Sequence, residues 1–164
     1  MNHPDEPAHR VGLGFDVHPF SDDPARLLVV GGVTVAGERG LAGHSDADPV
    51  AHAVADALLG GAGLGDLGTR FPDTDPAWAG ADSVRLLAAV AEAVRAAGWV
   101  PANVDCAVVL EAPRLAQDVS RMEAVLSEAI AAPVSVKPKR AEGLGALGRG
   151  EGVACWAVAL LRRR

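Results

Sequence analysis

The sequence predicts one α+β domain in which a mixed β-sheet carries its helices on one face. The chain has 164 residues, long enough for a single domain to bury a substantial core. Apolar residues recur at helical spacing in the helix candidates, whereas Val11–Phe20 and Val104–Leu110 have the composition of strands. The second half runs strand, helix, strand, loop, strand, an order typical of an α+β sheet.

The composition excludes several classes of protein. Apolar residues make up 49% of the chain and the formal net charge is −6, which argues against a nucleic-acid scaffold. No uncharged apolar run approaches the roughly 20 residues of a membrane span, so no membrane partner is expected. Residues 1–10 lack a secretory apolar stretch, so we expect a disordered tail and no signal peptide before a catalytic domain over 11–162. Cys106 and Cys155 are expected to be buried, reduced thiols, which fits a cytoplasmic protein.

The first strand, Val11–Phe20, places Asp16 and His18 on one face and Phe15 and Val17 on the other. We expect the apolar face to be anchored in the protein. The polar face then presents a carboxylate and an imidazole, both good zinc ligands, from one rigid segment. The alternative is an ordinary solvated strand face.

The other elements follow from turn, capping and periodicity signals. Gly31-Gly32 predicts a hairpin turn, and Asp46 is expected to cap a helix that ends at Gly60-Gly61. Glycine-rich loops are expected after this helix and before the last strand, and Arg162–Arg164 is expected to be a solvated basic end. In order, the remaining predictions are strands 26–30 and 33–36, helices 46–59, 82–97 and 118–131, and strands 104–110, 134–137 and 153–161.

The first predicted helix offers a third candidate metal ligand. Together with Asp16 and His18, His52 gives three protein ligands and leaves a fourth tetrahedral position open, the arrangement of a catalytic zinc site. Either Asp56 or Asp46 is a candidate for the acceptor that orients a ligand imidazole. The alternative is that His52 is a histidine satisfied within a helix interface.

Two further groups of residues suggest binding of a polar, anionic substrate. Asp66, Asp73 and Asp75 lie in loops that suit contacts with substrate hydroxyls, although aspartate is also common in turns for structural reasons. The last glycine-rich loop is flanked by basic residues, which favour phosphate, and by Glu142, which suits Mg²⁺. Here the alternative is a charged surface loop. The basic residues are Lys137, Lys139, Arg140 and Arg149.

The sequence offers no recognisable nucleophilic side chain for covalent catalysis. No Ser-His-Asp or Cys-His set is recognisable, and the glycines do not match a P-loop. If the protein carries out phosphate chemistry, metals must therefore contribute much of it and the nucleophile can belong to the substrate.

A series of short motifs then occurs in one order. They are GFDVH at 14–18, GHSDAD at 43–48, HxxxDALLG at 52–60, LGDLG at 64–68, FPDTDP at 71–76, GADS at 80–83, NVD at 103–105, EAP at 111–113 and GRGEG at 148–152. Together they closely resemble the 2-C-methyl-D-erythritol 2,4-cyclodiphosphate synthase family of the non-mevalonate isoprenoid pathway, over roughly Val11 to Leu161.

This resemblance implies a homotrimer with ferredoxin-like elements and active sites between neighbouring subunits. It implies conversion of 4-diphosphocytidyl-2-C-methyl-D-erythritol 2-phosphate into the cyclic diphosphate and CMP, by attack of the 2-phosphate on the β-phosphate. The alternatives are a metal-dependent phosphohydrolase with the same ligands and a catalytically silent trimeric module that binds metal and nucleotide.

Carried over by position, the resemblance assigns roles to individual residues. Asp16, His18 and His52 would bind zinc, and Glu142 would bind a second divalent cation, Mg²⁺ or Mn²⁺. His44 would lie near the reacting phosphates and be catalytic, and Arg140, where the chain departs from the family pattern, is expected to be catalytic as well. The substrate-binding positions would be Asp16, His18, His44, Ser45, Asp66, Leu67, Gly68, Phe71, Asp73, Asp75, Leu110, Ala112, Pro113, Arg114, Leu115, Ala116, Lys139, Arg140, Glu142, Ala146 and Arg149.

The chain departs from the family pattern near the phosphate site. Lys139-Arg140-Ala141 stands where the family usually has a run of threonines, one of which helps to stabilise the transition state. Arg140 is expected to donate to the same phosphate with a full charge. Ala146 replaces a frequent aromatic residue near the trimer axis, and Arg114 replaces a lysine with its charge kept.

Overall fold

A four-stranded mixed sheet in the order β1-β6-β4-β5 is the scaffold of the computed structural model, which describes residues 7–164. β6 runs antiparallel to β1 and to β4, β5 runs parallel to β4, and β2 pairs with β3 in a separate hairpin. The predicted α+β class is confirmed. In chain order the elements are β1 (His9–Pro19), β2 (Leu28–Val30), β3 (Val33–Val35), α1 (Pro49–Ala62), α2 (Leu67–Arg70), the 3₁₀ helix η1 (Pro76–Trp78), α3 (Ser83–Ala96), β4 (Trp99–Val109), α4 (Val119–Ile130), β5 (Val134–Lys139), α5 (Gly145–Gly148) and β6 (Gly152–Arg163).

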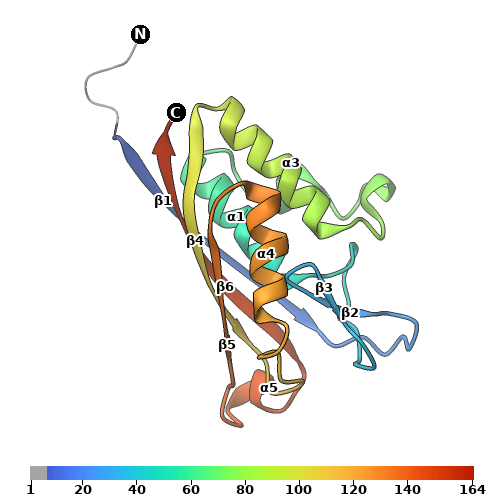
Figure 1. Ribbon diagram of the computed structural model, residues 1–164. Helices are drawn as coiled ribbons and strands as arrows, with labels where there is room; N and C mark the ends of the chain where they lie inside the picture. Colours follow the sequence, from blue (N-terminus) through green and yellow to red (C-terminus); the bar gives the residue numbers. More distant parts are fainter. Residues whose placement is uncertain (1–6) are drawn as a thin grey trace.

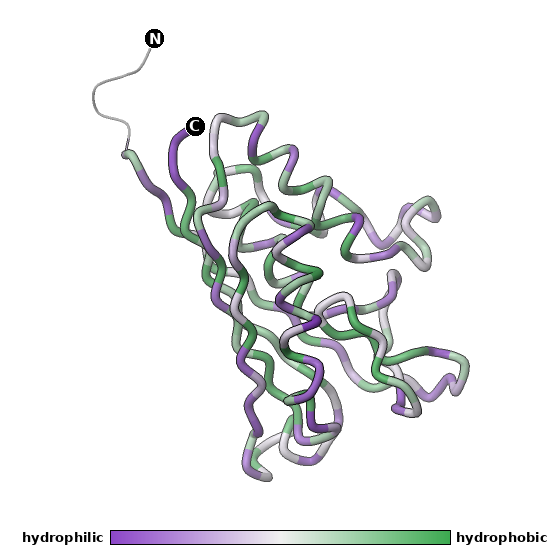
Figure 2. The backbone as a smooth tube through the Cα atoms, in the orientation of Figure 1, coloured by the Kyte–Doolittle hydropathy of each residue, from purple (hydrophilic) through white to green (hydrophobic). Residues whose placement is uncertain are grey.

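Helices α1, α3 and α4 lie on one face of the sheet, as predicted (Figure 1). α1 packs on β1 and β6, α4 packs on β5, and α3 contacts both of these helices. Hydrophobic segments run through the strands and the inner sides of the helices, while the outer turns are hydrophilic (Figure 2). Both cysteines, Cys106 and Cys155, are free and buried in this core, which confirms their prediction. Within residues 7–164, no helix combines the length and the apolar character that a membrane crossing requires.

The close packing of β1 against α1 depends on two glycines of the strand. A Cβ atom at Gly12 would lie 1.8 Å from the carbonyl oxygen of Ala57, and one at Gly14 would lie 1.8 Å from that of Ala53. Any side chain at either position would therefore push the helix away from the strand. This close approach brings α1 beside the part of β1 that carries the predicted metal ligands.

The opposite side of β1 is apolar and uncovered in the single chain. Val11 and Leu13 are 67% and 68% exposed, and the ring of Phe15 lies 4.9 Å from that of Trp156 on β6. The expectation that Phe15 and Val17 anchor the strand is therefore wrong for one chain, because the glycine side of β1 is the side that packs on the helix. A contiguous apolar surface of this kind is typical of an interaction site.

The ends of α1 differ from the prediction. Its N-cap is Asp48 rather than Asp46, and the buried Asp48 carboxylate accepts hydrogen bonds from the helix backbone and from the hairpin turn Gly31-Gly32. The helix continues through Gly60-Gly61, and the left-handed Gly63 supplies its C-cap. One carboxylate thus joins the hairpin to the start of α1.

The strands extend beyond their predicted ends. β1 begins at His9, so residues 9 and 10 of the predicted tail belong to the sheet; residues 7 and 8 precede the strand, and residues 1–6 lie outside the described part. β4 begins at Trp99, whose ring has the guanidinium groups of Arg10 and Arg163 at 4.6 and 5.0 Å from its centroid. The C-terminal arginines are therefore not simply a solvated end. Both predicted glycine-rich loops contain a short helix, α2 and α5.

Candidate metal and substrate site

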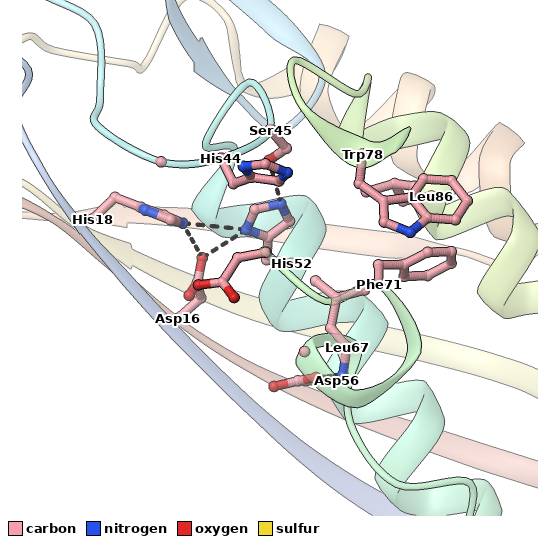
Figure 3. A pocket seen from close by; sticks show the side chains of 13 residues that line it. Asp16, His18, His44, Ser45, His52, Asp56, Leu67, Phe71, Trp78 and Leu86 are labelled. Atoms are coloured by element: carbon pink, nitrogen blue, oxygen red, sulfur yellow. Dashed lines mark hydrogen bonds and ion pairs between the residues drawn. The ribbon is translucent and has the colours of Figure 1, made fainter. Parts of the chain in front are cut away.

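Asp16 and His18 of β1 and His52 of α1 point toward one another (Figure 3). Asp16 Oδ2 lies 2.8 Å from His18 Nε2 and 2.9 Å from His52 Nδ1, and these two ring nitrogens are 3.2 Å apart. The side chains of Asp16, His18 and His52 are only 25%, 18% and 12% exposed. The structure therefore brings together the three residues that the sequence nominated from separate segments, and we refer to them as the ligand cluster.

The cluster keeps Asp16 as an anion. Burial raises the pKa of the Asp16 carboxyl, but the hydrogen bonds and charges of His18 and His52 outweigh burial and hold this pKa well below its usual range. Burial lowers the pKa of His18, but the hydrogen bond and the charge of Asp16 raise it above its usual value. An anionic oxygen therefore faces two imidazoles, an arrangement that attracts a cation.

A backbone carbonyl fixes the orientation of His18. His18 Nδ1 lies 2.8 Å from the carbonyl oxygen of Ala42, and a carbonyl only accepts, so Nδ1 carries a hydrogen and Nε2 is the nitrogen that can offer a lone pair to a cation. Gly43 leaves space for this ring, because a Cβ atom there would lie 3.1 Å from His18 Cε1.

The donor set fits a divalent cation. One carboxylate oxygen and two imidazole nitrogens all lie within 4.8 Å of one another. Zinc binds this combination, and three protein ligands leave one tetrahedral position for substrate or water. The open side of the cluster faces a cavity of about 470 Å³.

The wall of this cavity opposite the cluster is largely apolar (Figure 3). Phe71 and Trp78 meet edge to face, with ring centroids 4.9 Å apart and an interplanar angle of 80°. The predicted substrate-contact residues that line the cavity are Asp16, His18, His44, Ser45, Leu67, Gly68, Phe71 and Asp73. The sequence analysis did not assign Gly43, Trp78 or Leu86 to the site; Trp78 had a usable signal, since it follows the Asp-Pro pair that starts η1.

Asp66 and Asp75 serve as helix caps beside the cavity. Asp66 accepts a hydrogen bond from the backbone N–H of Thr69 at the start of α2, and Asp75 accepts one from Ala77 in η1. The backbone oxygen of Asp75 also accepts from His44 Nε2 at 3.1 Å. Turn chemistry thus accounts for one oxygen of each carboxylate, and neither residue lines the cavity in the single chain, so their contacts with substrate stay a prediction.

Asp56 does not orient His52. Its carboxylate accepts a hydrogen bond from the backbone N–H of Leu67 at 2.7 Å, and burial raises its pKa. The side chain therefore joins α1 to α2. The prediction of Asp56 as an acceptor for the ligand imidazole is wrong, since its oxygen is turned along the helix toward α2.

The residues predicted to hold the nucleotide form separate hollows. A cavity of about 220 Å³ is lined by Leu110, Pro113, Arg114, Leu115, Ala116, Lys139 and Arg140, together with Glu111 and Pro138. Ala112 and Arg149 line a neighbouring hollow of about 300 Å³. Neither shares a lining residue with the cavity of the ligand cluster. One chain therefore carries the two halves of the predicted site apart from each other.

Arg140 is paired with a carboxylate in the single chain. Its Nε lies 3.1 Å from Glu111 Oε1, and its Nη2 donates to the same oxygen. The Arg140 side chain is still 52% exposed. Glu142 follows in the loop between β5 and α5 with a left-handed φ of 55°, and Ala146 lies in α5.

Comparison with known proteins agrees with this geometry. The family model described as YgbB family matches residues 9–162. A Bordetella pertussis protein named 2-C-methyl-D-erythritol 2,4-cyclodiphosphate synthase is 54% identical over 157 residues, 94% of this chain and 96% of its own. A protein of the same name from Syntrophobacter fumaroxidans is 53% identical over 156 residues, 93% of this chain and 97% of its own.

Solved structures extend the likeness to three dimensions. A structure of 2C-methyl-D-erythritol-2,4-cyclodiphosphate synthase matches with a TM-score of 0.83 at 34% identity, covering 93% of this chain and 99% of the other. A Plasmodium falciparum IspF structure described as a CDP complex matches with a TM-score of 0.82 at 27% identity, covering 96% and 97%. Since the family model spans nearly the whole described part and the relatives are about half identical over the same length, the chain belongs to the YgbB family.

Proposed function

We propose that the protein converts 4-diphosphocytidyl-2-C-methyl-D-erythritol 2-phosphate into 2-C-methyl-D-erythritol 2,4-cyclodiphosphate and CMP, in the cytoplasm. The observation that carries the proposal is the convergence of Asp16, His18 and His52 at the wall of a substrate-sized cavity, in a chain of this family. The relatives with over half of their residues identical carry this activity in their names.

The ligand cluster would hold zinc. A bound zinc ion supplies Lewis acidity, which polarises the β-phosphate and offsets charge that develops during attack. Glu142 would hold the second cation, Mg²⁺ or Mn²⁺, since these ions combine one or two carboxylates with phosphate oxygens.

Around the cluster, the chain positions the substrate. We assign the erythritol part to the cavity of the ligand cluster, where Asp73 and Ser45 offer polar contacts and Phe71 and Trp78 exclude water. The exposed imidazole of His44 at this cavity would lie against the reacting phosphates. Holding the 2-phosphate against the β-phosphorus is the main task, and such positioning supplies about 7–11 kcal/mol in favourable cases. No protein nucleophile is required.

The nucleotide would occupy the hollow beside β5. Leu110, Leu115 and Pro113 offer an apolar surface to the base, and Arg114 and Lys139 offer charge to the phosphates. We propose that Arg140 stabilises the transferring phosphoryl group, using N–H donors that Glu111 does not engage. A guanidinium has five such donors, and the contacts to Glu111 use two of its nitrogens.

A homotrimer would join these two half-sites. The cavity of the ligand cluster and the nucleotide hollow share no residue within one chain, so a site between neighbouring copies would complete each half with the other. The uncovered apolar surface of β1 and β6, with Phe15 and Trp156 at its centre, supports association through the sheet. Mass measurement in solution tests the assembly.

The decisive test is product analysis by phosphorus NMR after incubation of the zinc- and magnesium-loaded protein with the cytidyl substrate. The proposal predicts equal amounts of the cyclic diphosphate and CMP. Release of inorganic phosphate or an open product would identify a metal-dependent phosphohydrolase instead. Binding of CDP without turnover would identify a silent binding module.

A further inference from the structure

The nitrogen of His52 that points away from the ligand cluster meets two serine hydroxyls. His52 Nε2 lies 2.8 Å from Ser83 Oγ and 3.1 Å from Ser45 Oγ. Ser83 is the first residue of α3 and is only 1% exposed. The start of α3 therefore lies directly behind the ring that α1 contributes to the cluster.

The hydroxyl hydrogen of Ser83 is committed to Asp46. Ser83 Oγ donates to Asp46 Oδ1, and the backbone N–H of Ser83 donates to Asp46 Oδ2 at 3.1 Å. A carboxylate only accepts hydrogen bonds, so the single hydroxyl hydrogen of Ser83 has its direction fixed. The lone pairs of Ser83 Oγ are then left to accept a hydrogen bond from His52 Nε2.

This chain of hydrogen bonds determines which nitrogen of His52 carries the hydrogen. With Nε2–H donating to Ser83, a cation can take the place of the hydrogen bond between Nδ1 and Asp16 Oδ2, and Nδ1, which also lies beside His18 Nε2, then offers that cation its lone pair. We propose that Ser83 and Asp46 are positioning residues that hold His52 in the tautomer and ring orientation that a cation at Nδ1 requires. Such outer partners of a ligand histidine fix its tautomer and raise its basicity.

The backbone around Asp46 is shaped to hold this carboxylate in place. The backbone N–H of Asp46 donates to the carbonyl oxygen of Ala81 at 3.1 Å. Ala47 follows with a φ of 58° and is fully buried, and Asp48 then turns back to cap α1. A left-handed alanine is strained and persists only where its surroundings determine it. The two aspartates thus serve different helices, Asp46 the start of α3 and Asp48 the start of α1.

Ser45 is the weaker of the two serine partners. Its Oγ is farther from His52 Nε2 and also lies 3.2 Å from the backbone N–H of Ala47 and 3.3 Å from Ser83 Oγ. Ser83, in contrast, is held by both oxygens of one carboxylate. We therefore assign the positioning role to Ser83 and Asp46.

The first test is the zinc affinity of the full-length protein, measured by competition with a chromophoric chelator. Ser83→Ala is expected to weaken zinc binding by about 10–100-fold, as is typical for loss of an outer partner of a ligand. Asp46→Asn keeps an acceptor but loses the charge, so we expect a smaller loss, about tenfold. Ser120→Ala, at an exposed serine in the first turn of α4, is the matched control and should leave the affinity unchanged.

The second test separates positioning from folding. In the zinc-loaded wild type, the Hε2 proton of His52 should give a downfield, slowly exchanging resonance, which Ser83→Ala should shift upfield. Thermal unfolding of the metal-free proteins checks that both variants fold; if Ser83→Ala does not, Asp46→Asn and the wild-type resonance decide.

Zinc affinity of Ser83→Ala within twofold of the wild type, or coordination of zinc through His52 Nε2, would overturn the inference. The inference rests on the proposed function only in that a divalent cation binds the cluster. None of these measurements uses turnover, so failure of the wild type to form the cyclic product would refute the proposed function alone.

Discussion

The ligand cluster and the β5–α5 loop are two charged regions of one chain, but they are organised in opposite ways. Asp16, His18 and His52 are largely buried and held from behind by the Ala42 carbonyl and the Ser83 hydroxyl. The loop with Arg140 and Glu142 is exposed, and its arginine is held by one carboxylate, that of Glu111. The first region is complete within the chain, whereas the second has charges available for a ligand.

This difference indicates which contacts fix the geometry of each region. The cluster is assembled by the packing of α1 on β1, so folding itself sets its geometry. The loop carries its charges on an exposed connection, and exposed ion pairs contribute little to stability. We therefore expect changes in the cluster to alter zinc binding and stability, and changes in the loop to alter substrate binding and turnover without altering zinc binding.

The largest effect is expected for Asp16→Asn. Asparagine has nearly the same shape but removes the anion that both histidines contact, so zinc affinity should fall by more than the roughly 100-fold typical of outer-partner mutations. The chelator competition measures it. Glu142→Gln is the control from the other region and should keep the zinc affinity of the wild type; a loss there would show that the two regions are not separate.

Arg140→Ala should act in the opposite sense. We expect kcat/KM for the cytidyl substrate to fall by about 10–100-fold, the equivalent of about 1.5–3 kcal/mol for a charged hydrogen bond. Zinc affinity should not change. Steady-state kinetics with CMP detection tests this, with Lys137→Ala, whose ammonium pairs with Asp105 on an exposed part of the sheet, as the control. Unchanged turnover in Arg140→Ala would remove Arg140 from the proposed mechanism.

Gly14→Ala tests whether the packing of α1 on β1 builds the cluster. The added methyl group would meet the Ala53 carbonyl, so the free energy of unfolding should fall by about 1–3 kcal/mol and zinc affinity should fall with it. The matched control is Gly60→Ala in α1, where an added Cβ atom would lie 4.0 Å from the carbonyl oxygen of Leu13, an ordinary contact distance. That change should stabilise the helix by up to about 1 kcal/mol. Urea unfolding distinguishes the two, and equal stability for Gly14→Ala would contradict the close packing.

The smallest effect is a pH dependence of the metal-free protein. The lowered pKa of Asp16 makes its contribution to stability present above about pH 4 and lost as the pH falls through the lowered value. The raised pKa of His18 makes its contribution present below about pH 6.5 and lost as the pH rises through the raised value. Asp16 and His18 together therefore stabilise the folded metal-free protein most between about pH 4 and about pH 6.5.

Urea unfolding of the metal-free wild type and of Asp16→Asn at pH 5.5 and 8.5 measures this dependence. The stability difference between the two proteins should be larger at pH 5.5, by on the order of 1 kcal/mol. A difference that is independent of pH would mean that Asp16 and His18 do not titrate as a pair.

Much of the cluster was predictable because its residues lie at fixed spacings in regular elements. Strand alternation placed Asp16 and His18 on one side of β1, and helical periodicity placed His52 on α1. For Ser83, the sequence predicted a place at the start of a helix but no role in the site. Its role depends on how the start of α3 meets α1, and such a contact between distant segments has no signal in one sequence.

The errors have a common physical cause. Phe15 and Val17 were expected to be anchored because apolar strand residues usually face a core, but the glycines of β1 mark the face on which the helix packs. Asp46 was expected to cap α1 because it precedes the apolar residues at helical spacing. The chain turns at the left-handed Ala47, however, and Asp48 is the residue that caps the helix. Tertiary contacts thus decided between local alternatives that the sequence left nearly equal.

The alternation of β1 has a consequence for the proposed assembly. Its odd-numbered residues form the uncovered apolar surface and its even-numbered residues include two of the candidate ligands, so one strand would take part in both the proposed contacts between copies and metal binding. If the proposed association strengthens metal binding, metal binding must strengthen the association by the same factor. Dilution that separates the copies should release the ion, and a chelator should loosen the assembly.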